Sequence, residues 1–571
     1  MNYIYNKLRY LLFLVVLVLL IPAAPISGTV SGAAGRYTVY EQAPPPAEKI
    51  DPAVGEALAG KDYVEVLVKL TRQVDTGLVA RDALRHAPSG EGGRAAVRAA
   101  VVNELRANAD ACQKSLMLYL EQERCSGNVL EYRGYYIVNM VFVKAAPAVV
   151  KQLARRADVK LILPNSVIQM ELPEIVESGE IISQAVEWGV SRINAPAAWS
   201  QGYMGQGVVV GVIDTGVDWQ HEALQTKWRG CNPSNPGSPN VDYNWFDATT
   251  PKSPLPKDAN GHGTHVTGTI LGSAGANQIG AAPGAQWIAA RAFGDDGRAY
   301  SSTLLSAGQF MLAPTDRNGQ NPRPDLAPHI VNNSWGSEIP GEADEWFRPM
   351  VQAWRSAGIL PVFSAGNDGG HGPGSISNPA NYPESLAVAA TDSGDKLASF
   401  SSRGPGYMEG IKPEISAPGV GIRSSYNNGG YATAQGTSMA APHVSGAAAL
   451  LLSANANLDV DELQQVLIDT AIPLTDPAYP EWPNYGYGYG LVDALAAINS
   501  LSTIYGDLDG SGSVNVVDAV MVLRHAASLL SLTPEQAAAA DANGDGYVNI
   551  ADAIIVLRYI AGLVGELPYR P

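Results

Sequence analysis

Residues 436–446 read Gly-Thr-Ser-Met-Ala-Ala-Pro-His-Val-Ser-Gly, and the apolar run 447–452 follows them directly. The pattern predicts a buried helix that begins beside Ser438. Gly436 allows the backbone to approach a ligand closely, and the free N–H groups at a helix start would stabilise an oxyanion. Ser438 is therefore a candidate nucleophile. Serine is also a common helix N-cap, so this stretch alone fits a structural role equally well. A catalytic role for Ser438 requires a base and a carboxylate elsewhere in the chain.

The length and composition of the chain limit its domain number and its classes of partner. The chain has 571 residues, several times the usual domain length of about 150 residues, so we expect several modules. Its net charge is −17 without a long Lys/Arg run, which argues against nucleic acid as a partner. The cysteines at 112, 125 and 231 are too few and too scattered for a disulfide framework. Cys112 and Cys125 could pair, but both fall on or beside one predicted helix, and we expect free thiols.

The N-terminal segment 1–28 has the features of a secretory signal peptide. Its first ten residues carry two positive charges, Lys7 and Arg9; the apolar run 11–21 follows, and the segment ends in small residues. A membrane-spanning helix needs about 20 apolar residues, so we expect no stable membrane insertion. The sequence predicts an exported protein.

Residues 29–185 are predicted to form a separate α+β unit, with its folded part at 60–165. Strand patterns at 63–70 and 159–164 enclose a helix at 95–123, two strands within 129–143 that meet near Arg133 and Gly134, and a helix at 148–156. This βαββαβ order predicts an open antiparallel sheet with helices on one face. Its position suggests a pro-region whose acidic connector, within 171–184, is cut; an independent binding domain is the alternative.

Residues 186–502 have the pattern of a parallel α/β sheet covered on both faces, because continuous apolar strands alternate with helices. Polar residues follow several of these strands: Asp214 follows 207–213, and Asn367 follows a strand near 359–363. The carboxyl ends of such strands are where sites form. His262 stands between glycines at a predicted helix start.

Asp214, His262 and Ser438 supply the three groups that acyl transfer needs. Serine requires a base to take its proton, and the base requires a carboxylate to orient it. The chain order Asp, His, Ser is one in which this machinery occurs. His265 and His443 also stand near candidate site residues, and the pattern alone does not rank the three histidines.

A family resemblance does rank them. The segments 212–216, 261–268 and 436–443 resemble the three signature segments of the subtilisin-like serine proteases. The resemblance implies that Asp214 is the orienting acid, His262 the general base, Ser438 the nucleophile and Asn367 the side-chain donor of the oxyanion hole. It also implies an inhibitory, chaperoning propeptide, and it implies that the chemistry needs no cofactor. The residues that it implies for substrate binding are Ser334, Trp335, Gly336, Ser364, Ala365 and Gly366.

The C-terminal region, 503–571, contains an acidic loop twice. Residues 507–518 and 541–552 align at a spacing of 34, with oxygen-bearing side chains at loop positions 1, 3, 5, 9 and 12 and glycine at position 6. Such a loop wraps Ca²⁺, although Asp replaces the Glu that ends an EF-hand loop. An Asx-rich turn would explain one copy but poorly explains two. The predicted ligands are Asp507, Asp509, Ser511, Ser513, Asn515, Asp518, Asp541, Asn543, Asp545, Tyr547, Asn549 and Asp552.

Each loop leads into an apolar helix, at 516–530 and 550–563, and no helix is expected before either loop. Tandem half EF-hands resemble the dockerin module. The resemblance implies a small all-α domain that folds around two calcium ions and binds a cohesin domain on a scaffold or cell-surface protein. Apolar residues at loop positions 10 and 11, among them Val516 and Ile550, suggest a hydrophobic contact with that partner.

Together these features predict a secreted serine endopeptidase. It would be made as a zymogen, act on protein or peptide substrates outside the cell, and dock through its dockerin at a cell surface or in a cellulosome-like complex. The alternative is an inactive subtilisin-fold binding or scaffold protein that is displayed through its dockerin.

Overall fold

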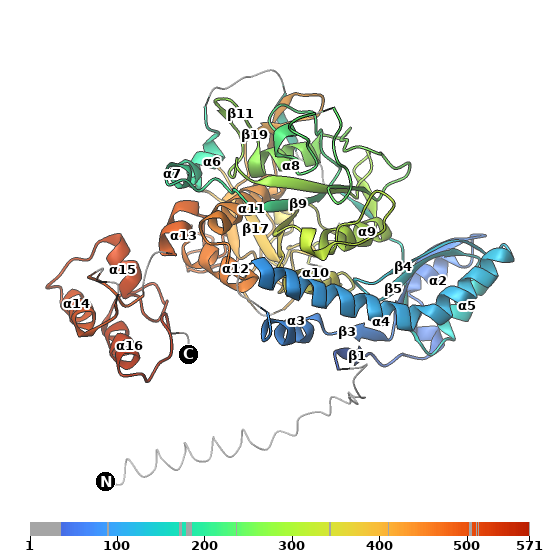
Figure 1. Cartoon of the computed structure of the whole chain (residues 1–571), viewed down its shortest axis with the longest axis horizontal. Coiled ribbons are helices and arrows are strands. Elements are labelled where there is room, and N and C mark those ends of the chain that lie inside the picture. The colour runs from blue at the N-terminus through green and yellow to red at the C-terminus, as the bar shows by residue number, and fades with distance from the viewer. Residues whose placement is uncertain are drawn as a thin grey trace, which may run out of the picture.

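The structure is a computed structural model of the chain, shown in Figure 1. It describes residues 36–87, 91–170, 174–178, 185–235, 237–337, 339–341, 344–408, 410–501, 505–509, 511 and 513–569. The predicted signal peptide, much of the predicted connector and Gly512 of the first acidic loop lie outside the described residues. No described helix combines the length and apolar character needed to cross a membrane.

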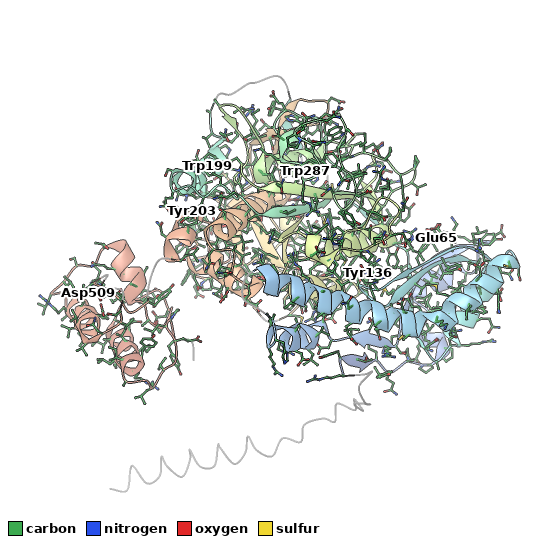
Figure 2. All side chains as sticks on the ribbon, in the orientation of Figure 1. Glu65, Tyr136, Trp199, Tyr203, Trp287 and Asp509 are labelled. Atoms are coloured by element: carbon green, nitrogen blue, oxygen red, sulfur yellow. The ribbon has the colours of Figure 1, made fainter. Side chains whose placement is uncertain are left out.

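A parallel sheet forms the centre of the largest unit. Within the described residues it has seven strands, and Trp287 lies in the core of this unit (Figure 2). The apolar runs of the sequence form these strands because both faces of the sheet are covered. In sheet order they are β10 (Trp245–Asp247), β13 (Gln286–Arg291), β9 (Val209–Asp214), β15 (Ile330–Asn333), β16 (Leu360–Ser364), β17 (Leu386–Thr391) and β18 (Ile415–Pro418).

Helices cover both faces of this sheet, and alternate residues of β9 show which helices lie on which face. Val210 and Val212 pack in one core with α8 (His262–Leu271) and α11 (Thr437–Ala454), whereas Val209 and Ile213 pack in another with α9 (Ser301–Leu312) and α10 (Arg348–Ser356). The predicted α/β fold with a parallel sheet is confirmed. The helices of this unit are α6 (Trp188–Arg192), α7 (Ala195–Ser200), α8 (His262–Leu271), α9 (Ser301–Leu312), α10 (Arg348–Ser356), α11 (Thr437–Ala454), α12 (Val460–Asp469) and α13 (Ala494–Ser500).

The N-terminal unit is an antiparallel sheet in the order β4-β5-β2-β6. Two helices cover one face, where Val66 and Val68 are buried, while Leu67 and Phe142 on the other face join the core that contains α9. The elements are β2 (Val64–Leu70), α4 (Glu91–Cys125), β4 (Val129–Tyr135), β5 (Met140–Ala145), α5 (Pro147–Ala154) and β6 (Val159–Pro164), with the smaller β1 (Thr38–Tyr40), α2 (Pro52–Ala57), β3 (Arg72–Val74) and α3 (Thr76–Leu84).

One expectation about this unit is wrong. The strands β4 and β5 do not meet at Arg133 and Gly134; β4 continues to Tyr135, and the connection lies at 136–139. Gly134 has a packing role instead, because a Cβ atom there would lie 2.2 Å from Oε1 of Gln113 on α4. The glycine therefore allows the helix to approach the strand.

The connector between the two units contributes two strands. β7 (Val167–Gln169) pairs with β14 (Arg298–Tyr300), and β8 (Glu174–Ser178) pairs with β20 (Tyr431–Gln435), whose other edge pairs with β19 (Ile422–Ser425). The sequence pattern predicts a loop where β8 lies. Backbone pairing to a sheet edge does not require a side-chain pattern, which explains the difference.

The C-terminal unit contains α14 (Val516–Ala526), α15 (Pro534–Ala540) and α16 (Ile550–Ile560). The expectation that no helix precedes the loops is wrong for the second loop, because α15 leads directly into Asp541. The predicted helices also end earlier than expected, since Ser528 and Gly562 adopt φ values of 58° and 68° that stop a helix. All three cysteines of the chain are free, as expected.

Candidate active site

Asp214 and His262 form a buried pair. Asp214 is the last residue of β9 and His262 the first of α8, and Nδ1 of His262 lies 2.7 Å from Oδ1 of Asp214. Each residue is only 1% exposed. Nε2 of His262 is buried without a hydrogen-bond partner among the described residues. The geometry therefore leaves Nε2 able to accept a proton.

Ser438 lies in the first turn of α11, and α11 packs against α8. Its hydroxyl donates a hydrogen bond to the carbonyl oxygen of Ser334 at 3.2 Å. Among the described contacts, none joins Ser438 to His262. Hydrogen bonds of this kind are often long or poorly aligned in a ligand-free site and tighten when substrate binds.

The amide of Asn367 is held by its neighbour. Its Oδ1 accepts hydrogen bonds from the backbone N–H of Thr437 at 2.8 Å and from the Thr437 hydroxyl at 2.9 Å. Because an amide oxygen accepts and an amide nitrogen donates, these bonds orient the side chain and leave Nδ2 as a donor for another group. Asn367 and Ser438 line the same cavity of about 250 Å³.

The same cavity contains most of the predicted substrate-binding residues. Ser334, Trp335, Gly336, Ser364 and Gly366 line it. Ala365 is absent from the lining, because its side chain is fully buried in the core beneath. Residues that the sequence reasoning did not select also line it, namely Gln169, Ser337, Asp368, Ser377 and Thr437.

Asp258 is a further buried carboxylate at this site. It accepts hydrogen bonds from the Thr215 hydroxyl at 3.0 Å and from the backbone and hydroxyl of Thr264 at 2.9 and 2.7 Å. It also accepts one from the N–H of Gly261 at 2.8 Å. Burial raises the pKa of Asp258. Asp258 is thus hydrogen-bonded both to the residue that follows β9 and to the first turn of α8. In the sequence, only its position four residues before His262 pointed to a role at the site.

The two rival histidines have other partners. Nε2 of His265 lies 3.1 Å from two backbone oxygens, those of Ile422 and Ala432, and Nδ1 of His443 lies 2.8 Å from the oxygen of Met439. Burial lowers the pKa of His265 to about 3 and that of His443 to about 4. The geometry therefore favours His262 as the base.

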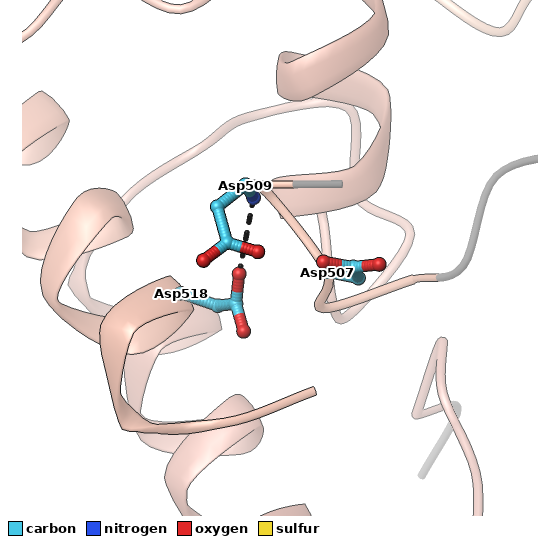
Figure 3. Close-up of side chains that lie close together, drawn as sticks. All are labelled: Asp507, Asp509 and Asp518. Carbon is cyan, nitrogen blue, oxygen red and sulfur yellow. Dashed lines mark hydrogen bonds between the residues drawn. The ribbon is translucent and has the colours of Figure 1, made fainter. Parts of the chain in front are cut away.

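The first acidic loop of the C-terminal unit gathers three carboxylates. Ligand oxygens of Asp507, Asp509 and Asp518 all lie within 4.8 Å of one another (Figure 3), and Asp518 is fully buried. The N–H of Asp509 donates to Oδ1 of Asp518 at 3.2 Å, the bond drawn in Figure 3. Like charges this close repel one another in a partly buried site. A cation would offset this repulsion, so these residues fit a hard divalent ion.

The second loop repeats hydrogen bonds of the first: the N–H of Asn543 donates to Oδ1 of Asp552 at 3.2 Å, as that of Asp509 does to Asp518. The carboxylate of Asp541 accepts hydrogen bonds from the N–H groups of Asp545 and Gly546 at 3.1 and 2.9 Å. Burial, and after it the nearby Asp552, raises the pKa of Asp541. A bound cation would lower that pKa.

The predicted ligands at loop position 9 have a structural role here. Oδ1 of Asn515 accepts from the N–H of Val517 at 2.9 Å, and Oδ1 of Asn549 accepts from that of Ala551 at 2.8 Å. Both asparagines are thus helix N-caps. At position 7, the backbone oxygens of Ser513 and Tyr547 accept hydrogen bonds from the side-chain amides of Asn515 and Asn549 at 3.1 and 3.2 Å. The hydroxyl of Ser511, at position 5, donates to the Ser513 oxygen at 3.2 Å.

Known proteins resemble this chain in two separate regions. The Subtilase family matches residues 205–490, and the dockerin type I domain matches residues 505–561. Bacillopeptidase F from Bacillus subtilis (strain 168) is 45% identical over 482 residues, which cover 82% of this chain and 33% of that protein.

Two shorter relatives match the catalytic region. Subtilisin BL from Lederbergia lenta is 37% identical over 316 residues, 55% of this chain and 99% of that protein. Subtilisin E from Bacillus subtilis (strain 168) is 33% identical over 317 residues, 55% of this chain and 72% of that protein. The chain thus spans about a third of bacillopeptidase F but most of the subtilisins that it matches. The chain therefore belongs to the subtilase family of serine proteases and carries a dockerin type I domain at its C-terminus.

Proposed function

We propose that the chain is a secreted serine endopeptidase in which Ser438, His262 and Asp214 form the catalytic triad. The observation that carries this proposal is the buried 2.7 Å contact between His262 and Asp214. It sets the proton of the imidazole on Nδ1 and leaves the lone pair on Nε2, which is the tautomer that a general base needs.

The reaction follows from this arrangement. Oγ of Ser438 bonds to the carbonyl carbon of the substrate while its proton passes to Nε2 of His262. The negative charge that develops on the carbonyl oxygen is stabilised by Nδ2 of Asn367 and by the backbone N–H at the start of α11. The C–N bond then breaks, the amine leaves with the proton from His262, and water hydrolyses the acyl-enzyme by the same steps.

We also infer that the N-terminal unit makes the chain a zymogen. Gln169, at the end of β7, lines the cavity beside Ser438. Only a few residues later, β8 pairs with β20, which leads into Gly436 and Ser438. Gln169, in the cavity that Ser438 lines, and Glu174, which pairs with Gln435, thus both lie close to the proposed nucleophile. This placement supports a connector that blocks substrates and is cut by the enzyme itself.

The C-terminal unit is proposed to bind calcium and a cohesin. Two calcium ions would be held by the acidic loops, with Asp507, Asp509 and Asp518 as ligands in the first. Apolar side chains at repeat-related positions are exposed on the two helices that follow: Val516 and Val520 on α14 are 56% and 45% exposed, and Ile550 and Ile554 on α16 are 59% and 52% exposed. Such surfaces usually mark a protein contact, which supports docking to a cohesin outside the cell.

The Ser438→Ala variant tests the catalytic proposal. We expect the full-length variant to remain an uncut precursor and to leave casein intact, while the unaltered chain is processed and active. Ser453→Ala on the same helix is the control and keeps both properties. Processing and casein hydrolysis by Ser438→Ala at the unaltered rate would overturn the proposal. Casein left intact by both the unaltered and the Ser453→Ala chains would support the alternative of an inactive binding protein.

A further inference from the structure

Arg291 is a buried arginine at the end of β13, beside the proposed orienting acid. It is 3% exposed. In the register of the sheet it pairs with Asp214, the last residue of β9, and neighbouring strands lie about 4.8 Å apart. The N–H of Ala292, the next residue, donates to the backbone oxygen of Asp214 at 3.0 Å. The sheet therefore places a guanidinium, which stays charged at any working pH, next to the pair of Asp214 and His262.

Four described acceptors hold the guanidinium of Arg291. Its Nε donates to the backbone oxygen of Thr215 at 3.1 Å, and its Nη1 donates to Oδ2 of Asp247 at 3.3 Å and to the hydroxyl of Thr249 at 2.7 Å. Nη2 donates to the carboxylate of Asp295, in the turn before β14. A guanidinium carries its N–H donors in a rigid plane. With an acceptor at each of its three nitrogens, this one is confined to a single orientation.

Thr215 is the residue through which Arg291 reaches the catalytic pair. The N–H of Thr215 donates to Oδ1 of Asp214 at 2.7 Å, and the same oxygen contacts Nδ1 of His262. The hydroxyl of Thr215 accepts from the N–H of Gly263 at 3.0 Å. One residue is thus bonded both to the acid and to the first turn of α8, and its carbonyl is the group that Arg291 holds.

The turn after Thr215 leaves little room for movement. Gly216 has a φ of 114°, and a Cβ atom there would lie 1.8 Å from the backbone oxygen of Lys257 and 3.3 Å from Cδ of Arg291. The glycine therefore allows a close approach that no other residue would permit. The backbone that follows Asp214 lies between the Lys257 carbonyl and the Arg291 side chain, so a shorter side chain at position 291 would leave a space beside this turn.

We propose that Arg291 is a positioning residue of the active site. It holds the carbonyl of Thr215 and thereby keeps Asp214 aligned with His262. Arg291 is not among the residues that line the cavity beside Ser438, so it acts through Thr215 and not on a substrate. A small misplacement of a catalytic group lowers the rate strongly even when its cause lies outside the site. This inference rests on the proposed triad and adds a residue that supports it.

The charge of Arg291 also acts on His262. A buried cation nearby disfavours the protonated imidazole, and removal of Arg291 would leave its two acidic partners uncompensated beside the pair. Asp214 on β9, Asp258 before α8 and His265 on α8 also lie around His262. These groups are the same in every Arg291 variant. A variant without the cation should therefore lose its base at a higher pH, which moves the acidic limb of the pH profile upwards.

The test compares variants of the full-length chain after processing. The values of kcat and KM for a chromogenic peptide are measured across the pH range and referred to the concentration of titratable active sites, so that incomplete processing does not count as a loss. We expect Arg291→Gln to lower kcat by about 10- to 100-fold, to change KM little and to move the acidic limb to higher pH. Arg291→Lys keeps the charge but cannot serve four acceptors, so its kcat should be intermediate and its acidic limb should stay near that of the parent.

Two further variants complete the test. Arg229→Gln is the matched control: this partly buried arginine bonds one side chain and two backbone oxygens elsewhere in the catalytic unit, and its loss should lower stability without changing kcat or the acidic limb. Thr249→Val removes one acceptor of Arg291 and should lower kcat less than Arg291→Gln does. It remains informative, with Arg291→Lys, if Arg291→Gln fails to fold.

The outcomes separate this inference from the proposed function. Parental kcat in the Arg291 variants, a lower kcat with an unmoved acidic limb in Arg291→Gln, or the same changes in Arg229→Gln would each overturn the positioning role. A parent chain without titratable active sites would instead overturn the proposed function itself.

Discussion

Nδ1 of His262 and Oδ1 of Asp214 are 2.7 Å apart, and both side chains are buried. Asp214 reaches this position because β9 ends there, and His262 because α8 begins there. The contact is thus made by two regular elements of a packed core, which hold the imidazole in one orientation without any ligand.

The substitution Asp214→Asn tests that orientation. An asparagine amide can donate a hydrogen bond to Nδ1, which would place the imidazole proton on Nε2 and remove the base. We expect kcat to fall by about 10⁴-fold with an unchanged fold, the size of the effect that this tautomer change has in other serine proteases. Peptide hydrolysis and circular dichroism measure the two properties. A loss of less than tenfold would contradict the assigned role of Asp214.

The substitution Asn367→Ala tests the oxyanion donor. Because Nδ2 of Asn367 would bond only the charged oxygen of the transition state, its loss should lower kcat by about 10²- to 10³-fold and change KM little; this range comes from subtilisin, a relative of this chain. Thr437→Ser is the matched control, since it keeps a hydroxyl that can hold Oδ1 of Asn367 and should remain active. If KM rises while kcat is retained, Asn367 binds the ground state instead.

Asp258 offers a test of how the pair is positioned. It accepts hydrogen bonds from Thr215, which follows Asp214, and from Gly261, which precedes His262. An amide in place of the carboxylate would face N–H or O–H donors with its own NH₂ group. We therefore expect Asp258→Asn to lower kcat more than tenfold and to shift the acidic limb of the pH profile. A change in thermal stability alone, with the pH profile unmoved, would mean that Asp258 only supports the fold.

Much of the catalytic unit was predictable because its elements are locally encoded. The apolar runs that form β9, β15 and β16 lead into polar residues of the candidate active site, so one pattern predicted both the strand ends and the site residues. The acidic loops were predictable for a similar reason, because their oxygen-bearing residues recur at fixed positions over twelve residues.

The remaining features depend on contacts between distant segments. Arg98 on α4 donates a hydrogen bond to the backbone oxygen of Ala357, which is 259 residues away in the chain. Gln169, which follows the N-terminal unit, lines the cavity of the catalytic unit. Such contacts leave no period or motif in a single sequence. The predicted turn at Gly134 was wrong for a related reason. From a single sequence, a glycine that allows a helix to approach a strand cannot be distinguished from a glycine that forms a turn.

Buried histidines should make the folded chain sensitive to acid. Burial lowers the pKa of His443 to about 4 from the value of 6.5 that it has when exposed. Above pH 6.5 the imidazole is neutral in both states, and the stability that depends on its neutral form is fully present. As the pH falls from 6.5 towards 4, the unfolded chain takes up the proton before the folded chain does, so this part of the unfolding free energy is lost. At about 1.4 kcal/mol for each pKa unit, the loss is about 3 kcal/mol.

The variant His443→Asn checks this prediction in the Ser438→Ala background. The asparagine amide can still donate to the backbone oxygen of Met439 but does not titrate. We expect the unfolding free energy of the variant, measured in urea, to fall less between pH 7 and pH 4 than that of the parent. Parallel pH dependences would show that His443 is not charged on unfolding in this range.

The acidic loops predict two separable calcium sites. Calorimetric titration of the Ser438→Ala chain with Ca²⁺ should show Asp507→Ala and Asp541→Ala each binding one ion fewer than the parent, because each removes the carboxylate at position 1 of one loop. Asp110→Ala, an exposed carboxylate on α4, should bind as the parent does. A chelator should lower the unfolding temperature of the C-terminal unit, since ion binding stabilises the folded state. Equal ion numbers in all four proteins would show that neither loop holds calcium.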